Sequence, residues 1–400
     1  MKLWQKVVIG MVLGVLFGLF FKPYTVYVEP VGIVFLNMIK MVIVPLVFFS
    51  MLNGITSVSD AGTFGRLGSK AFLMYISTST FAVLIGIIFA NVFKPGVGLT
   101  IDLGHPVKYQ DSGKLLKDLF INIIPTNPIK AMADGNILQV VVFAFFTGFA
   151  LILIGDKGKE VKSIISSCTH LVLKMIQLVV QLTPYGVFAI TSSVIAQYGM
   201  EIMLQLGKLI CVASGAFLVQ YILFGVMLLV LARINPMPFF RKMSNTQSLS
   251  LATASSKATL GTAMTELRNI GVSKESASFV LPLGAAINMD GSAIYLAICA
   301  IFSAQIFGIE LTFNHYIILM FTATIGAMGT GGSPGGAIVM MSMVLSSIGV
   351  PLEGVGVILG IDRILNSLRA MINIIGDCTV TLIIDKMEGT FDEKAYYSKM

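Results

Sequence analysis

The sequence predicts an all-α membrane protein with many transmembrane segments, and three observations lead to this prediction. Of the 400 residues, 56% are hydrophobic and 12% are charged, and the mean hydropathy is +0.89. A soluble globular domain has roughly twice that share of charged residues. Apolar runs near the ~20 residues that a helix needs to cross a bilayer recur from end to end. Two other segments have polar or glycine-rich centres between apolar arms, so we expect eight transmembrane helices and two re-entrant helical hairpins.

The apolar runs leave no room for a separate soluble domain, so the chain is predicted to be one polytopic unit in a lipid bilayer. The eight runs are Leu3–Phe21, Val31–Leu52, Ala71–Phe93, Leu138–Gly155, Val161–Ile195, Leu206–Ile234, Ser278–Ile306 and Val355–Ile384.

Basic residues predict the orientation of the chain in the membrane. The net charge is +7, but the lysines and arginines lie mainly at alternate connections between the apolar runs, as the positive-inside rule describes. This distribution argues against a nucleic-acid partner. It predicts a multi-pass protein of the cell (inner) membrane with both termini cytoplasmic. The first run lacks a small-residue cleavage site before Lys22, so we expect it to remain as an uncleaved span.

The two segments with interrupted apolar character are Ser244–Leu267 and Tyr316–Ser347. The first has the polar centre Thr253–Thr259, and the second has the glycine-rich centre Gly329–Gly336. Each arm is about half as long as a full crossing requires. Such a segment is expected to enter the membrane, turn, and leave on the same side, with its irregular backbone sheltered by protein or by a water-filled cavity.

Each hairpin is followed by a long apolar segment that contains polar residues, and this arrangement occurs twice. The first such segment contains Asn288–Ser292, and the second is the C-terminal helix. A single crossing separates the two copies, so the second copy must have the opposite orientation. An inverted repeat with interrupted segments at matching places predicts a transporter whose binding site lies near the middle of the bilayer.

Polar residues form one narrow stripe on the predicted C-terminal helix. At 3.6 residues per turn, their spacing of i, i+4, i+7, i+11 and i+15 places them on one face. Charged groups at such depth normally face a cavity, an ion path or each other. The stripe consists of Asp362, Asn366, Arg369, Asn373 and Asp377.

Arg369 is the one arginine on the stripe. Its planar guanidinium can bind a carboxylate through two hydrogen bonds, which suits an anionic substrate. The alternative is an internal ion pair with Asp362, two turns away, and the two interpretations are compatible if the substrate shares or displaces that pairing. Backbone N–H groups at the hairpin centres, around Ser255, Ser256 and Ser333, could also cradle a carboxylate.

Oxygen-bearing side chains predict cation sites beside the stripe. Asn288 and Asp290 interrupt one apolar segment, while Asn373 and Asp377 lie one turn apart on the next. Carboxylate, amide and hydroxyl oxygens together suit a hard cation. Hydroxyls on the third apolar run could complete such a site, or could simply form hydrogen bonds between helices; they belong to Tyr75, Thr78 and Ser79.

Enzymatic activity is not expected. An intramembrane aspartyl protease would need a Gly-x-Gly-Asp pattern, which is absent, and a serine protease would need a histidine near a nucleophile. His170, the histidine well inside an apolar run, has no such neighbour in the sequence. A channel could use the same polar residues, but a lone buried arginine suits a closed binding site better than an open pore.

In combination, the Asn288–Ser292 motif, the Ser255-Ser256 centre, the glycine-rich second centre and the polar C-terminal helix resemble the glutamate/aspartate transporter family, the dicarboxylate/amino acid:cation symporters. The resemblance covers essentially the whole chain. It implies a homotrimer in which a transport domain slides against a trimerisation scaffold, in an elevator-type cycle. The scaffold would comprise residues 1–69 and 119–200. The transport domain would comprise 70–118, with an extracellular loop, and 201–400, with a cytoplasmic tail.

The resemblance also implies sodium ions as co-transported ligands, with no cofactor. One implied sodium site consists of Tyr75, Thr78, Ser79, Asn288 and Asp290. A second consists of Gly284, Asn288, Asn373 and Asp377. A third uses the carbonyls of Ala286, Ala327, Met328 and Thr330.

By the same resemblance, Arg369 holds the side-chain carboxylate of the substrate, and the second hairpin is the extracellular gate. Asn373 and Ser256 match groups around the substrate α-carboxylate, and Ser333 lies at the second hairpin centre. The full implied substrate-binding set is Ser255, Ser256, Ser292, Ser333, Gly336, Asn366, Arg369, Ala370 and Asn373.

Three residues depart from the pattern of the amino-acid transporters in that family. Asn366 replaces the aspartate that holds the substrate amine, Ala370 replaces a threonine, and Lys257 adds a positive charge at the first hairpin. Losing an anion and gaining a cation both weaken binding of an ammonium group. We therefore expect a shift towards dicarboxylates that lack an amine.

The expected function is secondary active, sodium-coupled symport that imports glutamate, aspartate or a C4-dicarboxylate. The alternatives are a proton-coupled dicarboxylate symporter, and an anion channel or substrate sensor on the same scaffold.

Overall fold

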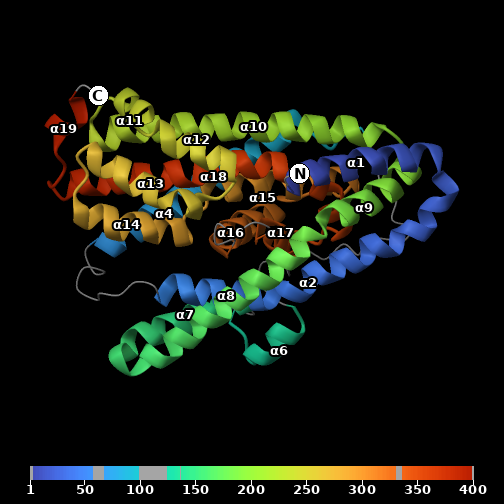
Figure 1. Cartoon of the computed structure of the whole chain (residues 1–400), viewed down its shortest axis with the longest axis horizontal. Helices are drawn as coiled ribbons and strands as arrows, with labels where there is room; N and C mark the ends of the chain where they lie inside the picture. Colours follow the sequence, from blue (N-terminus) through green and yellow to red (C-terminus); the bar gives the residue numbers. More distant parts are fainter. Residues whose placement is uncertain (1–2, 57–66, 99–123, 136, 330–335, 399–400) are drawn as a thin grey trace.

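All regular elements are helices in the part of the chain that the structure describes, residues 3–56, 67–98, 124–135, 137–329 and 336–398. The structure is a computed structural model (Figure 1). It confirms the predicted all-α class for those residues.

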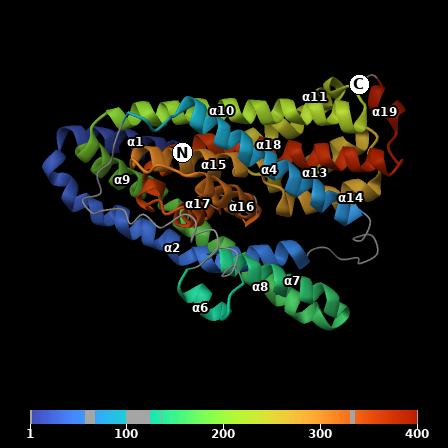
Figure 2. The same cartoon turned by 180° about the vertical axis from the view of Figure 1, so that it is seen from behind.

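The helices fall into two groups that pack internally (Figures 1 and 2). In the first group, α2 packs against α7, α8 and α9, and α1 packs along α9. The group comprises α1 (Leu3–Phe20), η1 (Lys22–Tyr24), α2 (Thr25–Thr56), α6 (Pro128–Ala133), α7 (Ile137–Ile154), η3 (Gly155–Gly158), α8 (Lys159–Gln181) and α9 (Thr183–Tyr198).

The second group surrounds the long helix α18, which contacts α10, α12, α13, α14 and α15. Its helices are α4 (Ser69–Phe93), α10 (Glu201–Met227), the π-helical turn η4 (Leu228–Ala232), α11 (Pro236–Lys242), α12 (Ser244–Thr253), α13 (Ser256–Asn269), α14 (Lys274–Ile287), α15 (Asp290–Ile306), α16 (Phe313–Gly329), α17 (Gly336–Ser347), α18 (Glu353–Met387) and α19 (Glu393–Tyr397). The predicted division into scaffold and transport domain stays a prediction.

Glycines let α1 and α9 approach closely. A Cβ on Gly14 would lie 2.7 Å from the carbonyl oxygen of Phe188, and one on Gly18 would lie 2.6 Å from that of Ser192. Helices in membranes commonly pack through small residues spaced four apart. Burial of apolar surface contributes little to helix association there, because the lipid is also apolar.

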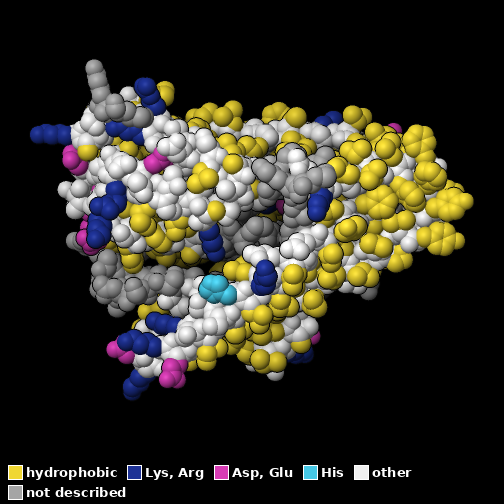
Figure 3. Space-filling view, viewed as in Figure 1, with side chains coloured by type: hydrophobic (Ala, Val, Ile, Leu, Met, Phe, Trp, Pro, Cys, Tyr) yellow, Lys and Arg dark blue, Asp and Glu magenta, His cyan; other side chains and the backbone are white. Residues whose placement is uncertain are grey.

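Five helical segments in the described residues are long and apolar enough to cross a membrane, or up to six if the bent pair α1 and α2 forms one span. The five segments are Ser69–Phe93, Gln139–Val179, Glu201–Ala232, Lys274–Ile306 and Ile364–Met387. The number of eight spans therefore stays a prediction. Exposed apolar side chains gather over α1, α2 and α9, whereas charged side chains gather at the opposite end of the molecule (Figure 3).

The prediction of one continuous span over Val161–Ile195 is wrong, because the helix is interrupted at Leu182. Helix α8 ends at Gln181, and α9 begins at Thr183 with Pro184 in its first turn. Proline has no N–H to continue the preceding helix and is well tolerated at a helix start. The apolar composition runs across the break and conceals it.

Three helix breaks place the polar groups of the second group. Asn288 and Met289 separate α14 from α15 in non-helical conformations. Ala254 and Ser255 form the turn between α12 and α13, which pack against each other. Helices α16 and α17 also pack together, and the centre between them, 330–335, lies outside the described residues. Helix α18 is continuous over 35 residues.

The C-terminal segment is hydrogen-bonded to α11 and to Asn235, the residue just before it. The Tyr396 side chain is fully buried; its hydroxyl donates to the carbonyl of Asn235 at 2.7 Å and accepts from the N–H of Phe239 at 3.1 Å. Lys242 Nζ donates to the carbonyls of Ala395 and Tyr396. Burial raises the pKa of the Tyr396 hydroxyl, so the group stays protonated and able to donate.

Tyr396→Phe should lower the stability of the protein by about 1–3 kcal/mol, because two backbone groups of the α11 region lose their partner where water has little access. Thermal unfolding of the purified protein in detergent measures this change. Tyr397→Phe is the matched control, since the Tyr397 hydroxyl makes one exposed hydrogen bond, with the N–H of Asn235. Equal melting temperatures for Tyr396→Phe and the unaltered protein would contradict this account of the segment.

Candidate functional site

Two polar clusters lie side by side along α18, and the first joins α4 to the break between α14 and α15. The Ser79 hydroxyl donates to Asp290 Oδ1 at 2.9 Å and lies 3.3 Å from Asn288 Oδ1. Thr78 Oγ1 lies 3.2 Å from the same oxygen of Asn288. All four side chains are buried. The hydroxyls therefore make the interhelical hydrogen bonds that the sequence left open, and cation binding by the same atoms stays a prediction.

The α14–α15 break places Asn288 between the carboxylates of α15 and α18. Its Nδ2 donates to Asp377 Oδ1 at 3.0 Å, while its Oδ1 faces the hydroxyls of α4. The other carboxylate oxygen of Asp377, Oδ2, has no hydrogen-bond partner among the described residues. A buried carboxylate oxygen without a donor is costly, and a bound cation would relieve that cost.

Gly284 gives the first cluster its compactness. A Cβ at this position would lie 2.6 Å from the Tyr75 hydroxyl and 2.7 Å from Asp377 Oδ1. The Tyr75 hydroxyl is itself held by the carbonyl of Val280, at 2.9 Å. The structure thus brings Tyr75 of the first implied sodium site next to Gly284 and Asp377 of the second, and sodium binding there stays a prediction.

Gln220 on α10 also reaches this cluster, and the sequence analysis missed it. Its Nε2 lies 3.4 Å from Asp290 Oδ2, the side chain is fully buried, and its Oε1 has no partner in the described part of the chain. The available signal was an amide side chain inside a long apolar helix, which normally faces other polar groups.

Asn373 connects the two clusters. Its Oδ1 accepts from the N–H of Gly291 at 2.8 Å, and its Nδ2 lies 3.2 Å from the sulfur of Met289. A Cβ on Gly291 would meet the carbonyl oxygen of Arg369 at 2.7 Å. The start of α15 therefore lies directly against the middle of α18, with Arg369 and Asn373 on either side of the contact.

The second cluster is built around Arg369, which is 2% exposed. Its Nη1 lies 3.0 Å from Asp362 Oδ1, and its Nη2 donates to Asn366 Oδ1 at 2.6 Å. The guanidinium carbon lies 4.1 Å from the centre of the Tyr295 ring. The internal ion pair with Asp362 is therefore present, and the cation–π contact with Tyr295 was not predicted from the sequence.

The turn between α12 and α13 lies over the second cluster. The Ser255 hydroxyl accepts from the N–H of Ala258 at 3.3 Å and so caps the start of α13. The Ser256 hydroxyl is buried and has no partner in the described residues. Asn366 Nδ2 donates to the carbonyl of Ala254 at 3.2 Å. Lys257 is exposed.

The remaining predicted residues have varied positions. Ser292 on α15 and Ala370, which follows Arg369 on α18, are buried, and Ala327 is buried within α16. Ala286 and Met328 pack against the small apolar cluster that contains Tyr75. Gly336 is the first residue of α17. Thr330 and Ser333 lie outside the described residues.

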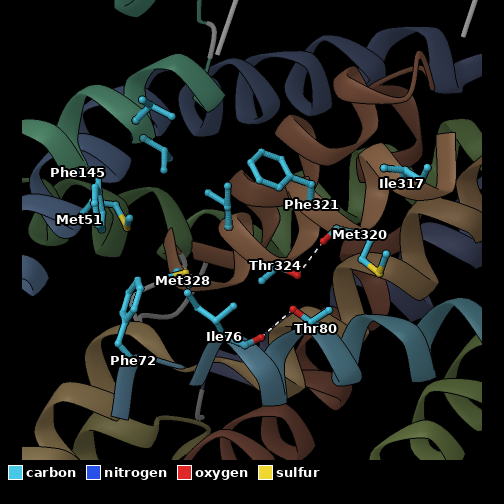
Figure 4. Close-up of a pocket in the computed structure, with 13 residues that line it drawn as sticks. Met51, Phe72, Ile76, Thr80, Phe145, Ile317, Met320, Phe321, Thr324 and Met328 are labelled. Carbon is cyan, nitrogen blue, oxygen red and sulfur yellow. Dashed lines mark hydrogen bonds between the residues drawn. The ribbon is translucent and has the colours of Figure 1, made fainter. Parts of the chain in front are cut away.

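An apolar cavity of about 520 Å³ lies apart from both polar clusters (Figure 4). It separates α2 and α7 from α4 and α16, and its lining includes Met51, Phe72, Phe145, Phe321 and Met328. The two threonines in its wall, Thr80 and Thr324, donate to carbonyls of their own helices. It offers no charged group to a ligand.

Chemically, the clusters suit anion binding next to cation binding. The first offers carboxylate, amide and hydroxyl oxygens, the set that a hard cation prefers, and the second offers a guanidinium. No group of three or more His, Cys, Asp and Glu side chains lies together in the residues that the structure describes.

Gly284→Ala should lower the free energy of unfolding by about 1–3 kcal/mol, because the added methyl cannot fit between Tyr75 and Asp377 without moving one of them. Thermal unfolding of the purified protein in detergent measures the effect. Gly207→Ala on α10 is the matched control, since a Cβ there has no neighbour within 4 Å. Equal melting temperatures for the two variants would show that the cluster is not tightly packed.

Comparison with known proteins identifies the family. A family model described as the sodium:dicarboxylate symporter family matches residues 3–387. The chain belongs to the sodium:dicarboxylate symporter family. This membership confirms the resemblance found in the sequence and places the protein among transporters rather than enzymes.

Relatives within the symporter family align along almost their whole length. The chain is 31% identical over 401 residues to the proton/sodium-glutamate symport protein of Bacillus subtilis, covering 97% of this chain and 93% of that protein. It is 34% identical over 404 residues to the C4-dicarboxylate transport protein of Rhodospirillum rubrum, covering 98% and 89%. It is 32% identical to the C4-dicarboxylate transport protein of Serratia proteamaculans over 413 residues, which cover 100% and 95%.

Proposed function

We propose that this protein is a secondary active symporter that imports a dicarboxylate, with sodium as the coupling ion and Arg369 as the anchor for a substrate carboxylate. The observation that carries the proposal is the position of Arg369, buried on α18 within one helix turn of Asn373 and two turns of Asp377. An anion site and an oxygen-rich cation cluster thus share one helix. Binding of each ion makes the neighbouring site electrostatically more favourable, which is the basis of coupling.

The relatives bear on both substrate and coupling ion. The name of the Bacillus subtilis relative gives glutamate as the substrate and protons or sodium as the coupling ion. The name of the Rhodospirillum rubrum relative gives C4-dicarboxylates as the substrates. The hydroxyl, amide and carboxylate oxygens around Asn288 favour sodium, since they form a shell of oxygens rather than a single proton acceptor. Proton coupling is the second candidate, and the name of the Bacillus subtilis relative is the observation in its favour.

Among acidic substrates, we favour C4-dicarboxylates without an amine. Asn366 has no negative charge, and its Oδ1 already accepts from Arg369. Asp362, the acid beside it, is paired with the same guanidinium. A substrate ammonium therefore meets a cluster whose acceptors are engaged by an arginine, and burial of an ammonium without a partner is unfavourable.

The proposal extends to the transport cycle. Helices α16 and α17 would form the extracellular gate, and the second helix group would move against the first in an elevator-type cycle within a homotrimer. The contact of α16 with α17, together with the glycine-rich segment between them, is the support for a hinged gate.

A competition assay tests the proposed substrate class. Unlabelled succinate, malate, fumarate, aspartate and glutamate are each added at increasing concentration to cells that take up radiolabelled succinate in sodium buffer. We expect the amine-free acids to compete at concentrations at least tenfold lower than aspartate or glutamate. Competition by aspartate but not by succinate or malate would overturn the assignment.

A further inference from the structure

The side chain of Asn366 joins two parts of the molecule that are far apart in the sequence. Its Oδ1 accepts from Arg369 Nη2 at 2.6 Å, and its Nδ2 donates to the carbonyl of Ala254 at 3.2 Å. Ala254 lies in the turn between α12 and α13, 112 residues earlier in the chain. One amide thus connects the guanidinium to the turn.

The orientation of this amide is fixed by its neighbours. A guanidinium only donates hydrogen bonds and a backbone carbonyl only accepts them. The oxygen of Asn366 must therefore face Arg369, and its nitrogen must face Ala254. Aspartate could not make both contacts, because its carboxylate oxygens would repel the carbonyl.

The turn depends on this contact more than an ordinary turn would. Ala254 has a left-handed backbone conformation, with φ of 51°, which is uncommon for a residue other than glycine. Ala254 is 3% exposed, and the buried hydroxyl of Ser256, two residues later, has no hydrogen-bond partner among the described residues. Such a conformation persists where surrounding contacts hold it in place.

We propose that Asn366 is a positioning residue that couples occupancy of Arg369 to the turn between α12 and α13. A substrate carboxylate is charged and binds a guanidinium more strongly than a neutral amide oxygen does. When the carboxylate takes Nη2, the Asn366 side chain loses its fixed orientation and the carbonyl of Ala254 loses its donor. The turn thereby exchanges its contact with Asn366 for contact with the substrate, because Ser255 and Ser256 of the turn belong to the implied substrate-binding set. This inference rests on the proposed function for the identity of the arriving group.

Hydrogen–deuterium exchange over residues 250–262, read by mass spectrometry on the full-length purified protein, tests the coupling. Asn366→Asp keeps the acceptor for Arg369 but removes the donor to Ala254. In the absence of substrate we expect exchange in this segment to rise about fivefold in the variant, the change that loss of one hydrogen bond produces. Saturating succinate in sodium chloride should remove the difference in exchange between the variant and the unaltered protein, because Asn366 no longer holds the turn in either.

Asp362→Asn is the matched control. It removes the negative charge beside Arg369 Nη1, and Asp362 makes no hydrogen bond with the turn among the described residues. Its exchange over 250–262 should therefore equal that of the unaltered protein. Equal exchange in Asn366→Asp and the unaltered protein, or an equal rise in both variants, would overturn the proposal.

A second measurement distinguishes failure of this inference from failure of the proposed function. Thermal-shift titration with succinate and with glutamate reports whether either acid binds. If neither binds, the proposed substrate class is wrong, and the substrate-free comparison of Asn366→Asp with Asp362→Asn still decides whether Asn366 holds the turn. If succinate binds and the difference in exchange between Asn366→Asp and the unaltered protein persists, the release step is wrong while the proposed function stands.

Discussion

Arg369→Ala should reduce dicarboxylate uptake to the background of cells without the transporter. The guanidinium is the buried cation at the second cluster, and hydrogen bonds from a charged donor to a carboxylate contribute about 1.5–3 kcal/mol each. Loss of two such bonds lowers affinity at least a hundredfold, since each 1.4 kcal/mol is roughly a factor of ten. Uptake of radiolabelled succinate over a range of concentrations measures the loss.

Removal of Arg369 alone would leave Asp362 without its cation, and an unpaired buried charge destabilises a fold. The double variant Arg369→Ala with Asp362→Asn separates the two effects, because it removes both charges. It should reach the membrane in normal amount and still take up no succinate. Arg268→Ala, at an exposed arginine of α13, is the matched control and should transport normally. Normal uptake by the double variant would show that another group binds the substrate.

If sodium is the coupling ion, as proposed, Asp290→Asn should raise the sodium concentration needed for half-maximal uptake at least tenfold. The substitution preserves the shape of the side chain and its ability to accept from Ser79, but removes the negative charge that a cation would balance. A tenfold change corresponds to about 1.4 kcal/mol, a modest share of the attraction expected between a cation and a buried carboxylate. Succinate uptake at a series of sodium concentrations, with choline as the replacement cation, gives the value.

Asp385→Asn on α18 is the control for Asp290→Asn on α15. Asp385 is also buried, but its carboxylate accepts from Ser273 and Thr390, away from the polar clusters. Its substitution should lower stability without changing the sodium requirement. If Asp290→Asn leaves the sodium dependence unchanged, or if both variants alter it equally, Asp290 is not part of a sodium site.

Helical periodicity predicted the parts of the site that lie on one element. The spacing of Asp362, Asn366, Arg369, Asn373 and Asp377 places them on one face of α18, and the structure has that arrangement. The Asn288–Ser292 interruption likewise predicted the break between α14 and α15, because its polar groups and glycine do not suit an apolar helix interior.

Contacts between helices that are far apart in the sequence could not be predicted from helical periodicity. Ser79 and Asp290 are 211 residues apart, and Asn366 and Ala254 are 112 apart. Periodicity reports the face of a helix, but not which other helix lies opposite that face. Gln220 and Tyr295 were missed for this reason: each lies in an apolar helix, and only the fold brings it to Asp290 or Arg369.

Purified protein in liposomes allows coupling to be measured without other transporters. Vesicles are loaded with potassium chloride and placed in sodium chloride that contains radiolabelled succinate. We predict that succinate accumulates inside above its external concentration, and that accumulation disappears when choline replaces sodium or when an ionophore removes the sodium gradient. Succinate that only equilibrates across the membrane, or that accumulates equally well without sodium, would contradict sodium-coupled symport by this protein.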